Sequence, residues 1–209
     1  MSKPRRFVVA GTGRSGTRYI QSVLRKCGLR VSHEQVFSPG GVREWGNRHG
    51  ESSGLAPPFL KDHHPGILIL HQVRHPLATI RSMLSRRTSP RAKQYEKQFL
   101  VPAGFPDLDF KNDRMRRATL MWLHRNELVD AAKPAMRWRV EDLDPSTLRG
   151  ILDLIGWDAG DDVLEEALAK TSTSLNRSNR KHPMPEWSDL PADLRARTVN
   201  LAREYGYPI

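Results

Sequence analysis

The most constraining feature of the sequence is a glycine-rich loop that lies between a short apolar run and an amphipathic segment. Phe7 to Ala10 is apolar, and residues 11–17 read Gly-Thr-Gly-Arg-Ser-Gly-Thr. Apolar residues then recur at helical spacing from Tyr19 to Leu24, and Gly28 ends the pattern. This order predicts a strand, a loop and a helix, in which converging backbone N–H groups and the helix dipole bind an oxyanion. The loop by itself does not identify the anion.

Further strands and helices are predicted along the rest of the chain. Ile67 to Val73 is almost continuously apolar, as expected for a strand buried on both faces of a parallel sheet, and Pro76 stands where a helix would begin. Other strands are predicted at 29–32 and 137–140, and helices at 76–84, 112–132 (capped by Asn112), 145–155, 161–170 and 191–205. Residues 38–66 are predicted to be mostly loop. The alternation predicts an α/β fold of three layers, α/β/α, around a central parallel sheet.

Length and charge indicate one domain and an anionic ligand. The 209 residues, 38% of them hydrophobic, suffice for one buried core, so residues 1–209 are expected to form a single domain. The formal net charge is +11, and 25 of the 34 basic residues are arginine. Arginine is the side chain best suited to a bidentate grip on phosphate or sulfate. A solvated basic surface is the alternative interpretation.

Composition also argues against several classes of protein. The longest purely apolar stretch, Ile67 to Leu70, is far shorter than the ~20 residues of a membrane-spanning helix. Phe7 to Ala10 is likewise shorter than the ~7–15 apolar residues that a signal peptide contains. Cys27 is the only cysteine, so it has no internal disulfide partner, and no metal-binding pattern is found. We therefore expect a cytoplasmic protein without a bound metal.

The glycine loop fits two general patterns. Its glycines have the G-x-G-x-x-G spacing of a dinucleotide-binding turn, and Glu34 follows the last of them by 18 residues, as an acid that binds a ribose hydroxyl would. The same glycines fit the spacing of a phosphate-binding P-loop. However, Thr17 and Arg18 stand where the magnesium-dependent form requires Lys and Ser or Thr.

The side chains inside the loop narrow this choice. Arg14, Ser15, Thr17 and Arg18 place two guanidinium and two hydroxyl groups around one helix start. With Gly16, they resemble the 5′-phosphosulfate-binding loop of sulfotransferases, which have a P-loop NTPase-like fold and use 3′-phosphoadenosine-5′-phosphosulfate (PAPS). The resemblance implies that these five residues bind PAPS and that Arg14 stabilises charge on the leaving phosphate.

A second segment resembles the same family independently. The second apolar strand ends in Val-Arg74-His-Pro, and Ser82 follows Arg74 by eight residues. This spacing resembles the 3′-phosphate-binding segment of sulfotransferases. An arginine at the carboxyl edge of a parallel sheet also points into the crevice where α/β proteins bind nucleotides. The resemblance implies that Arg74 and Ser82 bind the 3′-phosphate of PAPS.

Two further matches lie nearer the carboxyl terminus. Residues 139–143, Arg-Val-Glu-Asp-Leu, resemble a structural segment that follows a core strand in the family. Residues 176–181 resemble the loop that closes over the 3′-phosphate, which implies Arg180 and Lys181 as ligands, although the family's usual glycines are absent. A solvated loop is the alternative. The matches cover residues 7 to about 34, 67–84 and 137–143, with a weaker one at 176–190. They lie in a cofactor half, about residues 5–85 and 137–190, and leave the acceptor half without a match.

The acceptor side rests on fewer observations. In sulfotransferases whose base follows the second strand, that base is a glutamate, and Glu34 lies at a similar distance after the loop; the resemblance implies Glu34 as the base, with His33 as the alternative. Residues 38–66 and 89–113 are predicted to shape the acceptor pocket. Residues 74–125 contain 12 Lys and Arg against 4 Asp and Glu, which would suit an anionic acceptor such as a partly sulfated glycan. A solvated helix face is the alternative.

The sequence therefore predicts a PAPS-dependent sulfotransferase that acts on a hydroxyl or amine of a small molecule or glycan. A nucleotide-dependent kinase is the first rival, and the altered P-loop argues against it. A dinucleotide oxidoreductase is the second, and it leaves Arg74 and Ser82 without a role. A non-catalytic basic module that binds nucleic acid or a glycan would need neither segment, so nucleic acid is not the expected partner.

Overall fold

The fold is an α/β/α sandwich. The computed structural model describes residues 4–61, 66–85, 90–103, 113–172 and 182–209. Its central sheet has five strands in the order β2-β5-β1-β6-β7, and every neighbouring pair is parallel. The strands are β1 (Phe7–Ala10), β2 (Val31–His33), β5 (Gly50–Ser53), β6 (Leu68–Val73) and β7 (Met136–Arg139). The predicted α/β fold with a central parallel sheet is confirmed.

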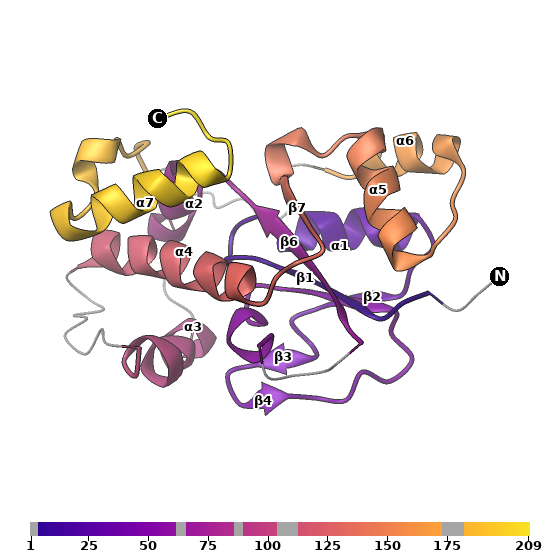
Figure 1. The fold of residues 1–209 in the computed structure, drawn as a ribbon, viewed down its shortest axis with the longest axis horizontal. Coiled ribbons are helices and arrows are strands. Elements are labelled where there is room, and N and C mark those ends of the chain that lie inside the picture. Colours follow the sequence, from indigo (N-terminus) through magenta and orange to yellow (C-terminus); the bar gives the residue numbers. More distant parts are fainter. Residues whose placement is uncertain (1–3, 62–65, 86–89, 104–112, 173–181) are drawn as a thin grey trace.

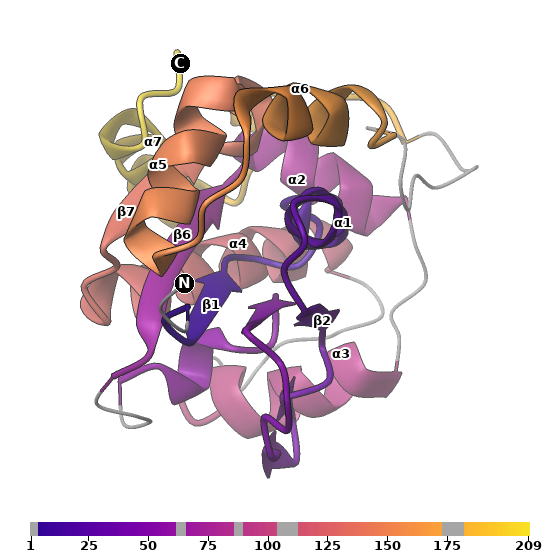
Figure 2. The ribbon, with the colours of Figure 1, turned by 90° about the vertical axis from the view of Figure 1, so that its right-hand side faces the viewer.

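Helices cover both faces of this sheet (Figure 1). One layer contains α1 (Thr17–Lys26), α5 (Pro145–Ile155) and α6 (Asp161–Ala169). The other contains α4 (Arg114–Ala131) and α7 (Ala192–Glu204), with α2 (Pro76–Leu84) packed against α4. Figure 2 shows α5 and α6 on one side of β1 and β6, and α3 (Pro90–Tyr95) on the other. None of the helices in the described ranges is long and apolar enough to cross a membrane.

Short elements complete the architecture. A hairpin follows β2, and single turns of 3-10 helix or π-helix connect the larger elements. The hairpin strands are β3 (Phe37–Ser38) and β4 (Gly41–Val42). The π-helical turn is η2 (Glu96–Leu100), and the 3-10 turns are η1 (Pro57–Phe59), η3 (Val140–Asp142) and η4 (Trp187–Asp189).

The core follows from the alternation of side chains along β1. Phe7 and Val9 point to the layer of α1, α5 and α6, whereas Val8 and Ala10 point to the layer of α4 and α7. All four are fully buried. A strand that is apolar on both faces can therefore lie only in the middle of the sheet, which places the loop that follows β1 at the centre of one sheet edge.

The structure corrects several predicted elements. The largest omission is β5, which lies within residues 38–66 and is a central strand of the sheet. The second strand begins at Val31 rather than residue 29. The cap of α4 is Asp113, whose carboxylate accepts a hydrogen bond from the backbone N–H of Arg116, at 2.9 Å; Asn112 lies outside the described residues. The helices predicted at 76–84 and 145–155 are confirmed.

Candidate anion-binding site

The glycine loop, residues 11–16, joins the carboxyl end of β1 to the start of α1 and is held from two sides. From β6, the side-chain amide of Gln72 donates a hydrogen bond of 2.6 Å to the carbonyl of Ser15. From α4, the carbonyl of Met121 accepts a hydrogen bond of 3.3 Å from the hydroxyl of Thr12. A Cβ on Gly11 would lie 2.3 Å from the backbone oxygen of Gln72, so only glycine fits there. The loop is therefore fixed before any ligand binds.

The helix end that the loop leads into is open to an anion. Gly16 is the N-cap of α1 with φ of 91°, a left-handed conformation that favours glycine. It supplies no side-chain cap, and the first turn contains no acidic residue. The positive end of the helix dipole is thus not offset locally. The hydroxyl of Ser15, which is fully buried, has no hydrogen-bond partner among the described residues. These features fit an oxyanion at the loop.

The two segments singled out in the sequence meet at this loop. The Nε of Arg14 donates a hydrogen bond of 3.0 Å to the hydroxyl of Ser82 on α2. Arg74, directly after β6, donates from Nη1 to the carbonyl of Arg14, also at 3.0 Å. They meet because β1 and β6 are parallel neighbours whose carboxyl ends lie at the same edge of the sheet. Two guanidinium groups and a hydroxyl from three segments therefore converge on one helix start.

The end of β2 also lies against the loop. The Nε2 of His33 and the hydroxyl of Thr17, the first residue of α1, are 3.0 Å apart and share a hydrogen bond. Burial lowers the pKa of His33, and the positive charge of Arg18 lowers it further, although the carboxylate of Glu34 opposes both effects. The lowered pKa favours the neutral form of the His33 imidazole. Glu34 follows it with φ of 52°, a left-handed conformation that is uncommon outside glycine.

A buried carboxylate that the sequence analysis missed fixes this turn. Glu51 on β5 is fully buried and accepts hydrogen bonds from the backbone N–H groups of Gln35, at 2.6 Å, and Val36, at 3.1 Å. It also accepts a hydrogen bond from the hydroxyl of Ser32. Burial raises the pKa of Glu51, and these hydrogen bonds partly oppose the rise. Glu51 thus holds the turn that carries His33 and Glu34.

The other predicted donor ligands are Arg18, Arg180 and Lys181. Arg18 is exposed on α1, next to the loop. Arg180 and Lys181 lie outside the described residues. The next residue, His182, is held on α2, because its carbonyl accepts a hydrogen bond from Nε of Arg81 at 2.7 Å and its N–H donates to the hydroxyl of Ser85 at 3.2 Å.

Residues 139–142 have the structural contacts expected of them. Glu141 accepts hydrogen bonds from the backbone N–H of His75, at 3.1 Å, and from the hydroxyl of Tyr207, at 3.0 Å. Arg139 forms an ion pair with Asp142 and donates to the carbonyl of Gly206 at 2.5 Å. These contacts tie the end of β7 to the residue after Arg74 and to the carboxyl-terminal segment.

Comparisons with known proteins identify the fold. No protein-family model matches the sequence, and no curated protein matches it. Among solved structures, the sulfotransferase domain of the Synechococcus PCC 7002 olefin synthase matches with a TM-score of 0.61 and 18% identity, over 100% of this chain and 97% of that domain. Mouse sulfotransferase SULT7A1, complexed with PAP, matches with a TM-score of 0.50 and 12% identity, over 98% of this chain and 84% of that one. The chain therefore has the fold of a sulfotransferase.

Proposed function

We propose that the protein is a sulfotransferase that transfers a sulfuryl group from PAPS to a hydroxyl or amine acceptor by in-line displacement. The observation that carries the proposal is the convergence of Arg14, Arg74 and Ser82 on the start of α1. A ligand with phosphate groups at two separate positions would use both segments, whereas a simple anion would need only the loop. The mouse sulfotransferase of similar fold is complexed with PAP, the desulfated form of such a donor.

The residues present fit this donor in number and kind. The open N-terminus of α1, the buried hydroxyl of Ser15 and the guanidinium of Arg14 would hold the 5′-phosphosulfate, together with Gly16 and Thr17. We propose as further donor ligands Arg18, Arg74, Ser82, Arg180 and Lys181. When bound, PAPS supplies the activated sulfuryl group.

The residues of the chain position the reactants and stabilise charge, as in phosphoryl transfer. Arg14 places a cation beside the loop, where negative charge develops on the leaving phosphate. Glu34 is proposed as the base that takes the acceptor's proton. His33 is the second candidate, because its ring reaches the hydroxyl of Thr17 at 3.0 Å and its lowered pKa favours the neutral form, which accepts a proton.

The acceptor is proposed to bind on the face of the sheet that α4 covers. Residues from both predicted acceptor segments, among them Trp45, Leu55, Tyr95 and Leu100, are buried there with residues of α4. The acceptor is proposed to be a small molecule or glycan.

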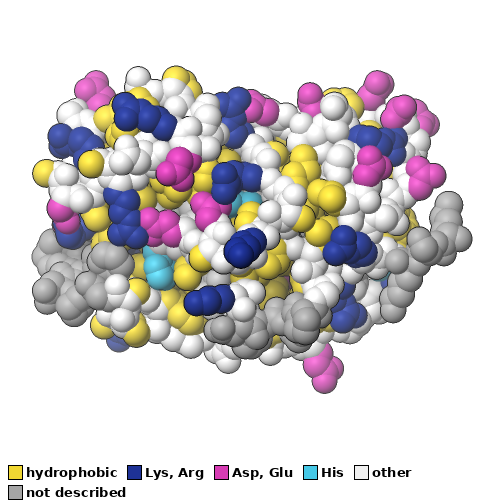
Figure 3. All heavy atoms as spheres, in the orientation of Figure 1, with side chains coloured by type: hydrophobic (Ala, Val, Ile, Leu, Met, Phe, Trp, Pro, Cys, Tyr) yellow, Lys and Arg dark blue, Asp and Glu magenta, His cyan; other side chains and the backbone are white. Residues whose placement is uncertain are grey.

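On the face of the molecule seen in Figure 3, Lys and Arg side chains are interspersed with Asp and Glu, so that face is no continuous basic surface. A cytoplasmic location remains a proposal from composition.

Calorimetric titration of the full chain tests the donor. PAP, ATP and NAD would each be added with and without magnesium. We expect PAP to bind more tightly than the other two, and its affinity to be independent of magnesium. Arg74→Ala should weaken binding of PAP more than binding of AMP, which lacks the 3′-phosphate. Tighter binding of NAD or of magnesium-ATP would refute the proposal in favour of an oxidoreductase or a kinase.

Two variants test the base. Glu34→Gln is expected to abolish sulfuryl transfer while PAP affinity stays near that of the native protein, because the amide cannot accept the proton. His33→Asn is the matched comparison at the adjacent position. Near-native turnover of Glu34→Gln, together with loss of turnover in His33→Asn, would assign the base to His33 instead.

A further inference from the structure

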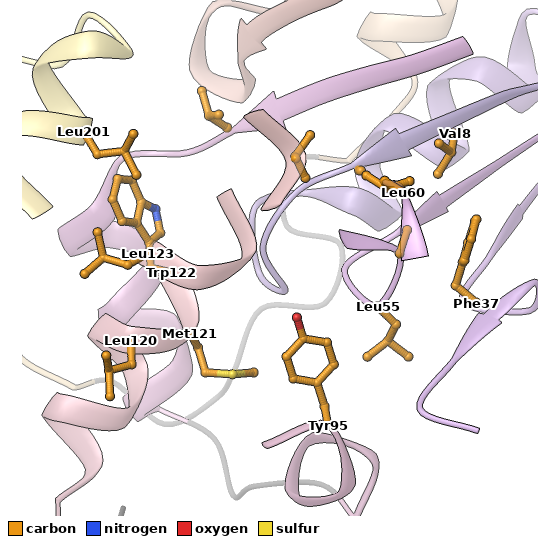
Figure 4. Close-up of a cluster of buried hydrophobic side chains, with 14 of the residues drawn as sticks. Val8, Phe37, Leu55, Leu60, Tyr95, Leu120, Met121, Trp122, Leu123 and Leu201 are labelled. Carbon is orange, nitrogen blue, oxygen red and sulfur yellow. The ribbon is translucent and has the colours of Figure 1, made fainter. Parts of the chain in front are cut away.

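Arg125 on α4 is a buried cation that contacts the glycine loop. The residue is only 4% exposed, and a Cβ on Gly13 would lie 2.8 Å from the Nη1 of Arg125. The guanidinium carbon lies 4.0 Å from the centre of the Tyr95 ring, a cation–π contact. Figure 4 shows Tyr95 with its hydroxyl directed away from its own helix, into the cluster that includes Met121 of α4. Arg125 is therefore held between the loop and the interior of the α4 layer.

Among the residues that the structure describes, no acidic side chain balances the charge of Arg125. Its Nε has no hydrogen-bond partner among them, and none of their ion pairs includes it. Arg117, on the same helix, differs because it forms an ion pair with the buried carboxylate of Glu96. Burial and then the charges of Arg125 and Arg197 lower the pKa of His124 to about 4. A buried cation is costly unless it is paired, so an anion that binds here would remove a cost already present in the fold.

The position of Arg125 distinguishes it from Arg74 and Ser82. Those two residues approach the loop from β6 and α2. Arg125 approaches it at Gly13, and Gly13 in turn abuts Gly54, directly after β5: a Cβ on Gly54 would lie 2.9 Å from the Cα of Gly13. β5 lies between β1 and β2, so Gly13 is on the side of the loop that faces β2, which ends at His33 and is followed directly by Glu34. A group in transfer must lie between the donor's phosphate and the base.

We propose that Arg125 binds the oxygens of the sulfuryl group of the donor, on the side of the loop away from the 3′-phosphate residues. This inference rests on the proposed function. The sulfuryl oxygens that Arg125 would bind are present in PAPS and absent from PAP. A fork of N–H donors buried beside the loop matches the tetrahedral oxyanion end of a sulfate ester.

Parallel titrations with PAPS and PAP test the assignment. The variant is Arg125→Met, and the matched control is Arg197→Met, which removes a guanidinium paired with Glu127 on the surface. Arg125→Met should weaken PAPS binding by about tenfold to a hundredfold, the value of hydrogen bonds to a charged group, and leave PAP binding near native. Arg197→Met should leave the affinities for both ligands near native. Equal weakening of PAPS and PAP by Arg125→Met would overturn the assignment.

Thermal unfolding of the ligand-free protein provides the readout besides binding. Because the buried charge is unpaired, Arg125→Met should unfold at a temperature no lower than the native chain. If Arg125→Met is instead destabilised, Arg125→Lys provides the test of the assignment, because lysine keeps the charge but cannot form a fork of N–H donors. Selective loss of PAPS affinity in Arg125→Lys would support the assignment. An unchanged preference for PAPS over PAP would overturn it. A native protein that binds neither PAPS nor PAP would refute the proposed function itself.

Discussion

Glu51 offers a sharp test of how the proposed catalytic turn is held, because its charge and its hydrogen bonds have opposite effects on stability. Glu51→Ala removes the acceptor of three buried or partly buried donors: the N–H groups of Gln35 and Val36 and the hydroxyl of Ser32. Glu51→Gln keeps Oε1 as the acceptor for both N–H groups and removes the ionisable carboxyl. Its amide NH2 takes the place of Oε2, so the hydroxyl of Ser32 must turn to accept a hydrogen bond instead of donating one. The pair of variants therefore separates the hydrogen bonds from the charge.

The structure sets the expected magnitudes. A buried donor left without a partner costs about 1–3 kcal/mol. Val36 is buried, whereas Gln35 is exposed and its N–H can bind water instead, so the full cost applies to Val36 and Ser32. Loss of the desolvated carboxylate offsets part of this. We expect Glu51→Ala to lower the free energy of unfolding by about 2–4 kcal/mol, and Glu51→Gln to change it by less than about 1 kcal/mol.

The pH dependence of stability provides a second, independent test of the role of Glu51. Burial raises the pKa of Glu51 in the folded protein, so the folded state holds its proton to higher pH than the unfolded chain. This group's contribution to stability therefore falls as pH rises from the ordinary glutamate pKa through the raised value. Glu51→Gln should remove that slope and be at least as stable as the native chain at neutral pH.

Urea unfolding followed by circular dichroism measures both effects. Glu165→Ala, at an exposed position on α6, is the matched control and should change the free energy of unfolding by less than about 0.5 kcal/mol. Equal stability of Glu51→Ala and Glu51→Gln would refute the reasoning, because it would show that the hydrogen bonds to the turn contribute nothing.

Two other perturbations follow from the structure. Gly11→Ala would place its Cβ 2.3 Å from the backbone oxygen of Gln72 in a central strand. We expect the free energy of unfolding, measured in urea, to fall by at least about 1–3 kcal/mol, and PAP binding, measured by calorimetry, to be lost. Near-native values of both would refute the close contact. His124 has its pKa lowered from 6.5 to about 4, so the unfolded chain binds more protons between these values and stability should fall by up to about 3 kcal/mol as pH drops from 6.5 to 4. His124→Gln should flatten that part of the stability profile, and an unchanged profile would contradict the assignment.

The elements that the sequence predicted well are those with a strong hydrophobic pattern. β6 begins with three apolar residues and ends with Val73, and α5 has a proline at its start and an apolar face, so these were predictable. β5 was not, because its residues are Gly-Glu-Ser-Ser and all four are buried. Its polar groups are satisfied inside the fold: Glu51 binds the β2 turn, and the hydroxyl of Ser52 donates to the carbonyl of Thr17 at 2.8 Å. A strand buried by pairing its polar groups has no pattern that hydropathy can reveal.

Some residues of the candidate site could likewise be predicted from the sequence, and others could not. Arg14, Arg74 and Ser82 could be chosen because their segments resemble those of sulfotransferases, and because a strand-end arginine and a glycine loop have fixed places at a parallel sheet edge. Arg125 could not be chosen, because an arginine within an amphipathic helix usually faces solvent. Only the packing of α4 against the loop shows that this side chain is buried. The ligand roles of all four residues remain predictions until binding is measured.

The left-handed backbone at Arg14 and Glu34 limits how this chain can be stabilised by engineering. Both residues have positive φ, 77° and 52°, which costs about 1–2 kcal/mol for a residue with a Cβ. Glycine at either position would relieve that cost, so selection for heat resistance alone would favour losing the two side chains proposed to act on the sulfuryl donor and acceptor. Lys133, with φ of 54°, lies in the turn after α4 and could become glycine without touching the site. A screen that scores only folding would thus favour all three changes, and only a screen that also requires turnover would keep Arg14 and Glu34.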